Sequence, residues 1–344
     1  MAPHQSTFGT HRLPRLAVAG LAVASLALAG CVGTEAPQSN QAAADADARH
    51  VRFAHVYDPS HPVETCGVPA INESLQDSGL VVDSYPAAQL GSEAESLEQV
   101  ASGGLDLAVA GPSFLGVWEE NVALFDAPYL FRDVDHFEAT LNGPIGDEIW
   151  AGLKESSGLD VLSSWYYGTR HVTANNEVHT SDDLAGQKLR AADAPLYLTM
   201  AEIMGGAATP MALDEAYLAL QQGTIDAQEN PIPTIASQKF YEVQDYLNLT
   251  GHMIQGVMVV ASESSLGAFS AEEQDALRTA AAEAQTAVRE CIEDQEASFL
   301  EEWRESGEIT VNDDVDVEHF RQRAADLIPE RFPWGERYLE IQES

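Results

Sequence analysis

Positive charge is scarce in this sequence. Its 344 residues include 17 lysines and arginines against 55 aspartates and glutamates, which gives a formal net charge of −38. Binding to phosphates requires a basic footprint, so this composition argues against a nucleic-acid partner. The excess of carboxylates instead indicates a solvated acidic surface that keeps the protein soluble in salt.

Common catalytic and metal-binding motifs are also absent. The sequence has no Gly-x-x-x-x-Gly-Lys loop, no His-Glu-x-x-His and no Gly-x-Ser-x-Gly. His50, His55 and His61 lie close together but lack the spacing and the thiol partners of a zinc site. We therefore expect no enzyme activity, no cofactor and no metal site.

Long hydrophobic runs are missing after residue 30, so we expect no membrane-spanning segment there. Before that point, Arg12 and Arg15 precede an apolar stretch over 16–30 that is too short to span a membrane comfortably. The small residues before Cys31 resemble the lipobox of bacterial lipoproteins. By that resemblance, residues 1–30 are a lipoprotein signal peptide and the Cys31 thiol carries lipid. A plain signal peptide with an incidental cysteine is the alternative.

Residues 31–50 show no periodicity and are rich in Ala, Gln and Asp, which predicts a flexible tether. We expect the mature protein outside the cytoplasm, anchored to the membrane surface by its lipid. Cys66 and Cys291 remain, and an exported compartment permits a disulfide between them. Because Cys291 also continues the apolar stripe of a long helix, a buried free thiol is equally compatible with the sequence.

Strand and helix patterns alternate along the body of the chain, which indicates an α/β fold. Strand patterns occur at 51–57, 80–86, 105–111 and 187–191. The pattern around Gly168 predicts a strand, a turn and a second strand, and two more strands are predicted at 246–251 and 257–262. Ser-x-x-Glu capping boxes predict helices that start at Ser92 and Ser270, the second running to about residue 304.

Four stretches in the same order resemble the solute-binding proteins of TRAP (tripartite ATP-independent periplasmic) transporters of the DctP type. They read QLGSEAESLEQVASGGLDLAVAG, FDAPYLFRD, SDDLAGQKLRAADAPLYL and GGAATPMALDEAYLALQQGTIDAQENPIPTIASQKFYEVQDYLNLTGH. The resemblance covers about residues 51–290. It implies an α/β, two-lobed periplasmic-binding-protein-like fold with crossing strands and a long C-terminal helix. It also implies a lobe I of 51–167 plus about 253–294, and a lobe II of 168–252 plus about 295–344.

The function implied by the resemblance is capture of an organic acid for ion-gradient-driven import. The acid is a mono- or dicarboxylate, sugar acids included, and the partners are the membrane permease subunits of a TRAP transporter. We expect a monomer. A binding protein that presents a carboxylate to a sensory receptor and an ABC-type binding lipoprotein are the alternatives. A lipid-anchored hydrolase is disfavoured because no nucleophile, base and acid set is visible.

The resemblance also assigns residues to the ligand. It implies that Arg190 pairs with the ligand carboxylate, that Arg170 assists and that Asn230 binds the ligand too. Leu213 stands where many members have an aromatic residue, and Gly111 or a neighbour replaces a polar residue of sugar-acid binders. Both departures argue against a sialic-acid-like ligand.

The chemistry of the residues agrees, because a buried guanidinium is costly without an anion and matches a carboxylate fork. Each assignment has a structural alternative. Arg190 could pair internally with Asp193 or Glu215, Arg170 could pair on the surface, and Asn230 could cap the turn before the next proline.

Three further residues complete the predicted site. Trp165 and Tyr167 could line the cleft or belong to the core, as could Tyr166 between them. Asp58 follows the first strand and is expected to face the cleft in this architecture.

Overall fold

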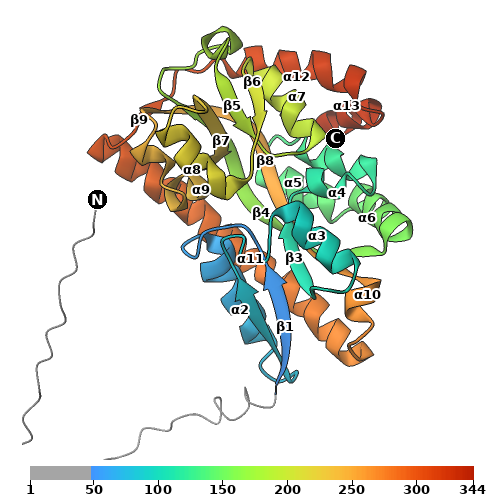
Figure 1. Ribbon diagram of the computed structural model, residues 1–344. Helices are drawn as coiled ribbons and strands as arrows, with labels where there is room; N and C mark the ends of the chain where they lie inside the picture. Colours follow the sequence, from blue (N-terminus) through green and yellow to red (C-terminus); the bar gives the residue numbers. More distant parts are fainter. Residues whose placement is uncertain (1–47) are drawn as a thin grey trace, which may run out of the picture. The chain divides into compact units, whose positions relative to one another are not determined.

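The computed structural model describes residues 48–344, so residues 1–47, including Cys31, lie outside the described residues. One mixed sheet runs through the molecule (Figure 1). Its nine strands are β1 (Arg49–Ala54), β2 (Leu80–Tyr85), β3 (Leu107–Ala110), β4 (Leu159–Ala174), β5 (Lys188–Ala191), β6 (Ala207–Pro210), β7 (Ala227–Pro231), β8 (Tyr246–Ser262) and β9 (Thr310–Asn312). The predicted tether over 31–50 is therefore too long by two residues, because β1 begins at Arg49.

The strand order is β2-β1-β3-β8-β4-β7-β5-β6, and β9 pairs with β8. Strands β1, β2 and β3 are mutually parallel at one end of the sheet, and β5, β6 and β7 are parallel at the other. The antiparallel pair β4 and β8 joins the two ends. The α/β, two-lobed fold with crossing strands is thus confirmed.

Both crossing strands were predicted as two shorter strands, and this prediction is wrong. Strand β4 is continuous over 16 residues and β8 over 17. The glycine signal at Gly168 marks a β-bulge instead of a turn, because the register with β8 shifts between Tyr166 and Gly168. Gly168 has a φ of 129°, a conformation that glycine adopts readily because it has no Cβ.

Helices cover both sides of the sheet. They are η1 (Val63–Gly67), α2 (Val68–Ser74), α3 (Glu93–Ala101), α4 (Pro112–Leu115), η2 (Glu120–Asp126), α5 (Val134–Leu141), α6 (Pro144–Ser157), η3 (Ser181–Leu184), α7 (Pro195–Met204), α8 (Leu213–Gln221), α9 (Ile232–Ser237), η4 (Phe240–Glu242), α10 (Glu263–Leu266), α11 (Ala271–Ser306), α12 (Val317–Arg331) and α13 (Gly335–Glu343). The capping boxes at Ser92 and Ser270 are both formed, which confirms the predicted starts of α3 and α11.

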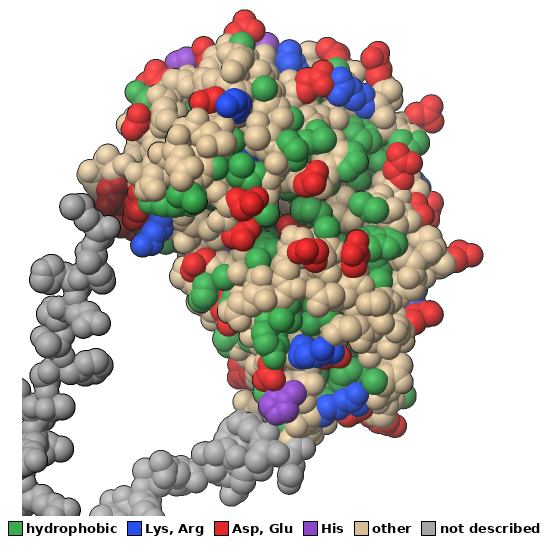
Figure 2. All heavy atoms as spheres, in the orientation of Figure 1, with side chains coloured by type: hydrophobic (Ala, Val, Ile, Leu, Met, Phe, Trp, Pro, Cys, Tyr) green, Lys and Arg blue, Asp and Glu red, His purple; other side chains and the backbone are tan. Residues whose placement is uncertain are grey.

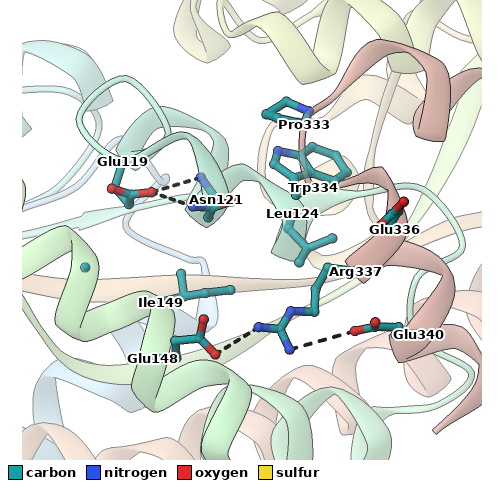
Figure 3. A pocket seen from close by; sticks show the side chains of 11 residues that line it. Glu119, Asn121, Leu124, Glu148, Ile149, Pro333, Trp334, Glu336, Arg337 and Glu340 are labelled. Carbon is teal, nitrogen blue, oxygen red and sulfur yellow. Dashed lines mark hydrogen bonds and ion pairs between the residues drawn. The ribbon is translucent and has the colours of Figure 1, made fainter.

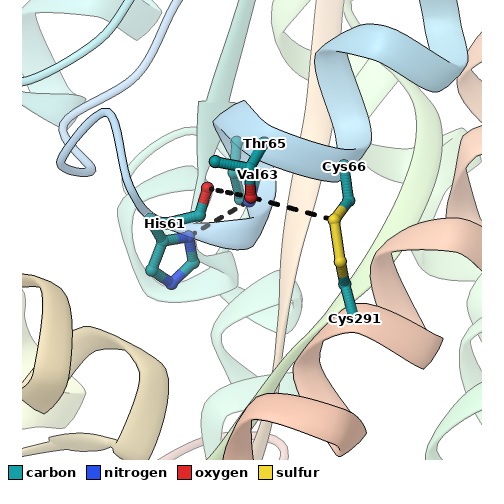
Figure 4. Close-up of a disulfide and its surroundings, with 5 residues drawn as sticks. All are labelled: His61, Val63, Thr65, Cys66 and Cys291. Carbon is teal, nitrogen blue, oxygen red and sulfur yellow. Dashed lines mark hydrogen bonds between the residues drawn. A yellow bond between two sulfur atoms is a disulfide. The ribbon is translucent and has the colours of Figure 1, made fainter.

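The long helix α11 runs along the crossing strands (Figure 1). A disulfide between Cys66 of η1 and Cys291 of α11 ties the first helical segment to it, with Cα atoms 6.6 Å apart (Figure 4). This settles the question that the sequence left open in favour of the disulfide. Trp165 of β4 packs on the same helix and donates a hydrogen bond from its indole nitrogen to the carbonyl oxygen of Ala281 at 2.9 Å.

Acidic side chains dominate the face shown in Figure 2, and few lysines or arginines interrupt them. A hollow lies near the centre of this face, between α8 and α3, with hydrophobic and acidic side chains around it. Over residues 48–344, no helix combines the length and the apolar character needed to cross a membrane.

Candidate ligand-binding site

Two adjoining cavities lie between the part of the molecule built on β1, β2 and β3 and the part built on β5, β6 and β7. The outer cavity has a volume of about 310 Å³ and the inner one about 20 Å³. Five residues line both cavities: Glu93, Phe114, Arg190, Ala192 and Leu213. The cavities are therefore two parts of one cleft, which helices α3 and α4 border on one side and strand β5 and helix α8 on the other.

Arg190 lies at the junction of the two cavities. Strand β5 buries it to 4 % exposure, and its guanidinium donates from Nε and Nη2 to the carbonyl oxygen of Met211 at 3.1 and 2.8 Å. It forms no ion pair with Asp193, Glu215 or any other carboxylate within residues 48–344, so the predicted internal salt bridges are wrong. Burial lowers the pKa of Arg190 from its usual value, and the charge of Arg170 acts in the same direction. Its positive charge thus faces the cavity without a matching carboxylate.

Arg170, by contrast, is fully engaged inside the protein. It is 3 % exposed, and its Nε and Nη2 atoms donate to the carboxylate of Glu229 at 2.5 and 2.8 Å. Its Nη1 donates to Oε1 of Gln255 at 2.6 Å, and its Nη2 also reaches Oδ1 of Asn230 at 3.0 Å. The alternative of a surface ion pair is wrong, because this pair is buried.

The partner of Arg170 is itself held by a second group. Glu229 is fully buried, and one of its oxygens lies 3.1 Å from Nε2 of His252. Burial acts to raise the pKa of Glu229, but the charge of Arg170 and the hydrogen bonds from His252 and Arg170 outweigh it and lower the pKa to about 2. Glu229 is therefore an anion, and the ion pair behind the inner cavity is electrically neutral.

Asn230 and Tyr167 line the inner cavity together. The amide nitrogen of Asn230 donates to Oε1 of Gln228 at 2.7 Å, while its Oδ1 accepts from Arg170 and, at 3.4 Å, from the Tyr167 hydroxyl. Tyr167 also accepts a 2.6 Å hydrogen bond from the hydroxyl of Thr234. Asn230 is thus oriented by three side chains, and it does more than cap the following proline.

Of the remaining predicted residues, one lines the cavities and two do not. Leu213, the first residue of α8, lines both cavities as expected. Trp165 lies in the core against Phe53 and α11 and lines neither cavity. Asp58 also lines neither cavity. Its carboxylate accepts hydrogen bonds from the backbone amide and the hydroxyl of Ser60 at 2.8 and 2.7 Å.

Glu93 is a site residue that the sequence reasoning missed. It is the first residue of α3, and its Oε1 accepts a hydrogen bond of 3.1 Å from the amide of Gly111. Burial in the cleft raises the pKa of Glu93 to about 7, although the amide of Gly111 and the charge of Arg190 oppose this rise. Its signal was a second acidic residue at the helix start, next to the Glu95 that the capping box explains.

Other missed residues form the walls of the inner cavity. They are Tyr57, Phe114, Tyr197 and Gln255. Tyr197 donates to Oδ2 of Asp126 at 3.2 Å, and Gln255 donates to Oδ1 of the same carboxylate at 2.9 Å. A Cβ on Gly111 would come within 3.3 to 3.5 Å of Gln255, Asp126 and Tyr197, so the glycine leaves this wall open.

A larger cavity, of about 720 Å³, lies elsewhere among the described residues (Figure 3). Glu119, Glu148, Glu336, Glu340 and Arg337 line it, together with a few apolar side chains. Its single arginine is paired with Glu148 at 2.8 Å and with Glu340 at 3.8 Å. This cavity offers an organic acid no unmatched cation, so size alone does not identify the site. Among residues 48–344, no cluster of three His, Cys, Asp or Glu side chains could hold a metal ion.

A sheet crossed by two long strands, with an unmatched buried arginine in a cleft between its ends, is typical of the two-lobed solute-binding proteins. Comparisons with known proteins give the same class. The chain is 33 % identical over 258 residues to the sialic acid-binding periplasmic protein of Vibrio cholerae; the matched region covers 75 % of this chain and 80 % of that protein. It is 32 % identical over 265 residues to the 2,3-diketo-L-gulonate-binding periplasmic protein of Escherichia coli, covering 76 % and 80 %.

Solved structures agree with these relatives. The TRAP periplasmic solute-binding protein of Actinobacillus succinogenes, solved with bound L-galactonate, superposes with a TM-score of 0.81 at 28 % identity, covering 86 % of this chain and 98 % of that one. Over residues 70–333 the chain also matches the bacterial extracellular solute-binding proteins of family 7, the DctP family. The chain belongs to this family, the solute-binding components of TRAP transporters.

Proposed function

We propose that the protein captures an organic acid with the ligand carboxylate on Arg190. The observation that carries this proposal is the state of the Arg190 guanidinium, which is buried, faces the cleft and has only a carbonyl oxygen as its partner. A buried charge without a counterion is costly, so a carboxylate that enters the cleft gains both charge pairing and a two-pronged hydrogen bond.

Asn230, Tyr167 and Arg170 complete the carboxylate end in this proposal. All three line the inner cavity and are linked by hydrogen bonds, so they form a rigid polar wall beside Arg190. Phe114 and Leu213 supply apolar contact at the junction with the outer cavity. Sugar acids suit such a site because they combine one carboxylate with hydroxyl groups, and the relatives named above bind or are named for sugar acids.

The two lobes move about the crossing strands in this proposal. The first lobe is residues 51–167 plus about 253–294, and the second is residues 168–252 plus about 295–344. The bulge at Gly168 supports a hinge there, since a shift of register interrupts the ladder at the proposed boundary. The hydrogen bond between Tyr197 and Asp126 would then join the lobes in the closed state.

We also propose that the protein delivers the acid to the membrane subunits of a TRAP transporter, a role that its membership of the family supports. We further propose that the protein is anchored by lipid on Cys31 and that it does not transform its ligand. Cys31→Ser is expected to release the protein from the membrane fraction of a bacterial host. A variant that stays in that fraction contradicts the anchor. Ligand recovered unchanged after long incubation supports a purely binding role, and a product in its place contradicts it.

A thermal-shift screen of organic acids tests the binding function. The chain without residues 1–31 is suitable, because it keeps all of the described residues, 48–344. A true ligand stabilises the folded state by an amount that grows with its concentration. A rise in melting temperature with at least one acid, absent in Arg190→Ala, is the expected result. A panel of mono- and dicarboxylates that produces no shift contradicts the proposal.

A further inference from the structure

Charge is distributed unevenly along the cleft. At the inner end two arginines line the cavity, but the charge of Arg170 is matched by Glu229 at 2.5 Å. Arg190 has no carboxylate partner among residues 48–344. The cleft therefore presents one unmatched positive charge to a ligand.

The outer end carries the opposite charge. Its acidic lining residues are Glu93, Asp193, Asp214 and Glu215, and Arg190 is the only lysine or arginine among the lining residues. Figure 2 shows acidic and hydrophobic side chains around the central hollow and no lysine or arginine beside it. An anionic group at this end would meet four acidic side chains, and Arg190 is the one cation of the lining that could offset them.

Glu93 is the acidic residue closest to the ligand path, because it lines the outer and the inner cavity. Its carboxylate is held by the amide of Gly111 at 3.1 Å. At the amino end of α3, a capping box already occupies the amides of Ser92 and Glu95. A hydroxyl group beside Glu93 can donate to it, whereas a carboxylate or a phosphate cannot without taking up a proton.

We propose that the cleft accepts acids with a single carboxylate and that Glu93 rejects ligands with a second anionic group at the far end. This inference rests on the proposed function, since it places the first carboxylate on Arg190. Specificity of this kind arises when like charges are brought together in a site that excludes water, so that the wrong ligand is penalised while the right one is unaffected. The site thus separates hydroxy monoacids from diacids of the same length.

Matched pairs of acids test the inference. L-galactonate and galactarate, and D-gluconate and D-glucarate, differ only in a CH₂OH group that is replaced by a carboxylate. Burial raises the pKa of Glu93 to about 7; the charge of Asp126 acts in the same direction and those of Arg190 and Arg170 oppose it. Calorimetric titration is therefore done at pH 8, above this pKa, where Glu93 is ionised. We expect the monoacid of each binding pair to bind roughly tenfold or more tightly than its diacid, a difference of about 1.4 kcal/mol or more.

Glu93→Gln removes the charge and keeps the shape, so it is expected to reduce the ratio of monoacid to diacid affinity by about tenfold. Glu98→Gln makes the same change on an exposed position of α3 that lines neither cavity, and it should leave the preference unchanged. Thermal unfolding of both variants checks that they are folded.

Three results overturn the inference. A diacid that binds as tightly as its monoacid contradicts it while leaving the proposed function intact. An unchanged preference in folded Glu93→Gln contradicts the role of Glu93. Should no acid of either kind bind, the proposed function fails and the inference fails with it.

Discussion

Arg170 and Arg190 make an instructive pair, because the same side chain has opposite surroundings in two regions of one sheet. Both are buried, at 3 % and 4 % exposure, and both line the inner cavity. Arg170 makes two hydrogen bonds to the Glu229 carboxylate, whereas Arg190 has only a backbone carbonyl. Burial alone therefore does not distinguish an arginine that is paired within the fold from one that has no carboxylate partner. The partner distinguishes them.

The two arginines compete for one carboxylate. Strand β7, which carries Glu229, lies between β4 and β5 and is therefore adjacent to both arginine-bearing strands. The Glu229 carboxylate is hydrogen-bonded to Arg170 of β4. Arg190 of β5 lies near the same charge but forms no ion pair with it, and its partner on β6 is Thr209.

The largest effect is expected from Arg170→Ala, which should destabilise the fold itself. Removal of one partner leaves Glu229 buried and uncompensated, a situation that costs about 3–5 kcal/mol. Urea unfolding of the unliganded protein measures the loss. Arg190→Ala is the matched control and should unfold at the same urea concentration as the parent or a higher one. Equal destabilisation by the two variants would remove the distinction drawn between them.

Arg190→Ala should instead weaken binding. Loss of one partner of a buried charge pair costs about 2–5 kcal/mol, or roughly 30-fold to several thousandfold in affinity. Arg190→Lys should also bind poorly, because an ammonium keeps the charge but loses the two-pronged geometry. Calorimetric titration with the best acid from the screen gives both values. Parent-like affinity in a folded Arg190→Ala protein would show that the carboxylate binds elsewhere.

Reduction of the disulfide tests stability at a place remote from both arginines. Loss of the Cys66–Cys291 bond, in the Cys66→Ser/Cys291→Ser variant, should cost about 2–4 kcal/mol because the bond closes a long loop. Neither cysteine lines the cleft, so the affinity for the ligand should be retained in the folded fraction. An affinity that falls together with the melting temperature would indicate that the disulfide positions the site.

The smallest effects concern pH, and two glutamates should act in opposite directions. The pKa of Glu229 is lowered to about 2, so its contribution to stability is present above its ordinary pKa of 4.5 and is lost as the pH falls towards 2. The pKa of Glu296 is raised to about 7 by burial, so its contribution is present below 4.5 and is lost as the pH rises through 7. The melting temperature should therefore be highest between about pH 4.5 and 7.

Variants can assign the acidic and the alkaline sides of the pH profile of the melting temperature to different groups. Glu296→Gln should make the alkaline side less steep, because the glutamine side chain beside Tyr166 and the backbone amide of Thr169 cannot ionise. Part of that side should remain, since burial also raises the pKa of Glu93 to about 7. The acidic side should be unaffected by this change. A profile whose alkaline side is the same in parent and variant would assign that limb to other groups.

The sequence predicts the fold well wherever burial follows hydrophobic alternation. Strands β1, β2, β3 and β5 were predicted from alternating or apolar strand patterns, and the helix starts at Ser92 and Ser270 were predicted from their capping boxes. Strand β7 was missed because its buried residues are Gln228, Glu229 and Asn230, whose polarity is compatible with burial only through partners on other elements. Strand β6 was missed because its Ala-Ala-Thr-Pro sequence is mostly exposed and has no apolar pattern.

The candidate site shows the same limit. The positions of Arg190, Asn230 and Leu213 in the cleft could be anticipated from the family resemblance, and their roles in binding stay predictions. The sequence could not show that Trp165 lies in the core while Tyr167 lines the cleft. Residues i and i+2 of a regular strand share a face, and only the bulge between Tyr166 and Gly168 changes the register here. Glu93 could not be singled out either, because an acidic residue at a helix start is explained equally well by the helix dipole.

The crossing strands also determine when this protein can fold. Strand β3 needs β8 as its neighbour, with Ala108 opposite Val260, and the first helical segment is joined to Cys291. The sheet lacks its central strand until the chain has been made to Ser262, the end of β8, and β9 adds its last strand at Thr310–Asn312. Contacts this distant in sequence form slowly, so the emerging chain stays open for most of its synthesis. An interleaved architecture of this kind is well suited to a protein that crosses a membrane as an unfolded chain and acquires its shape, and its disulfide, on the far side.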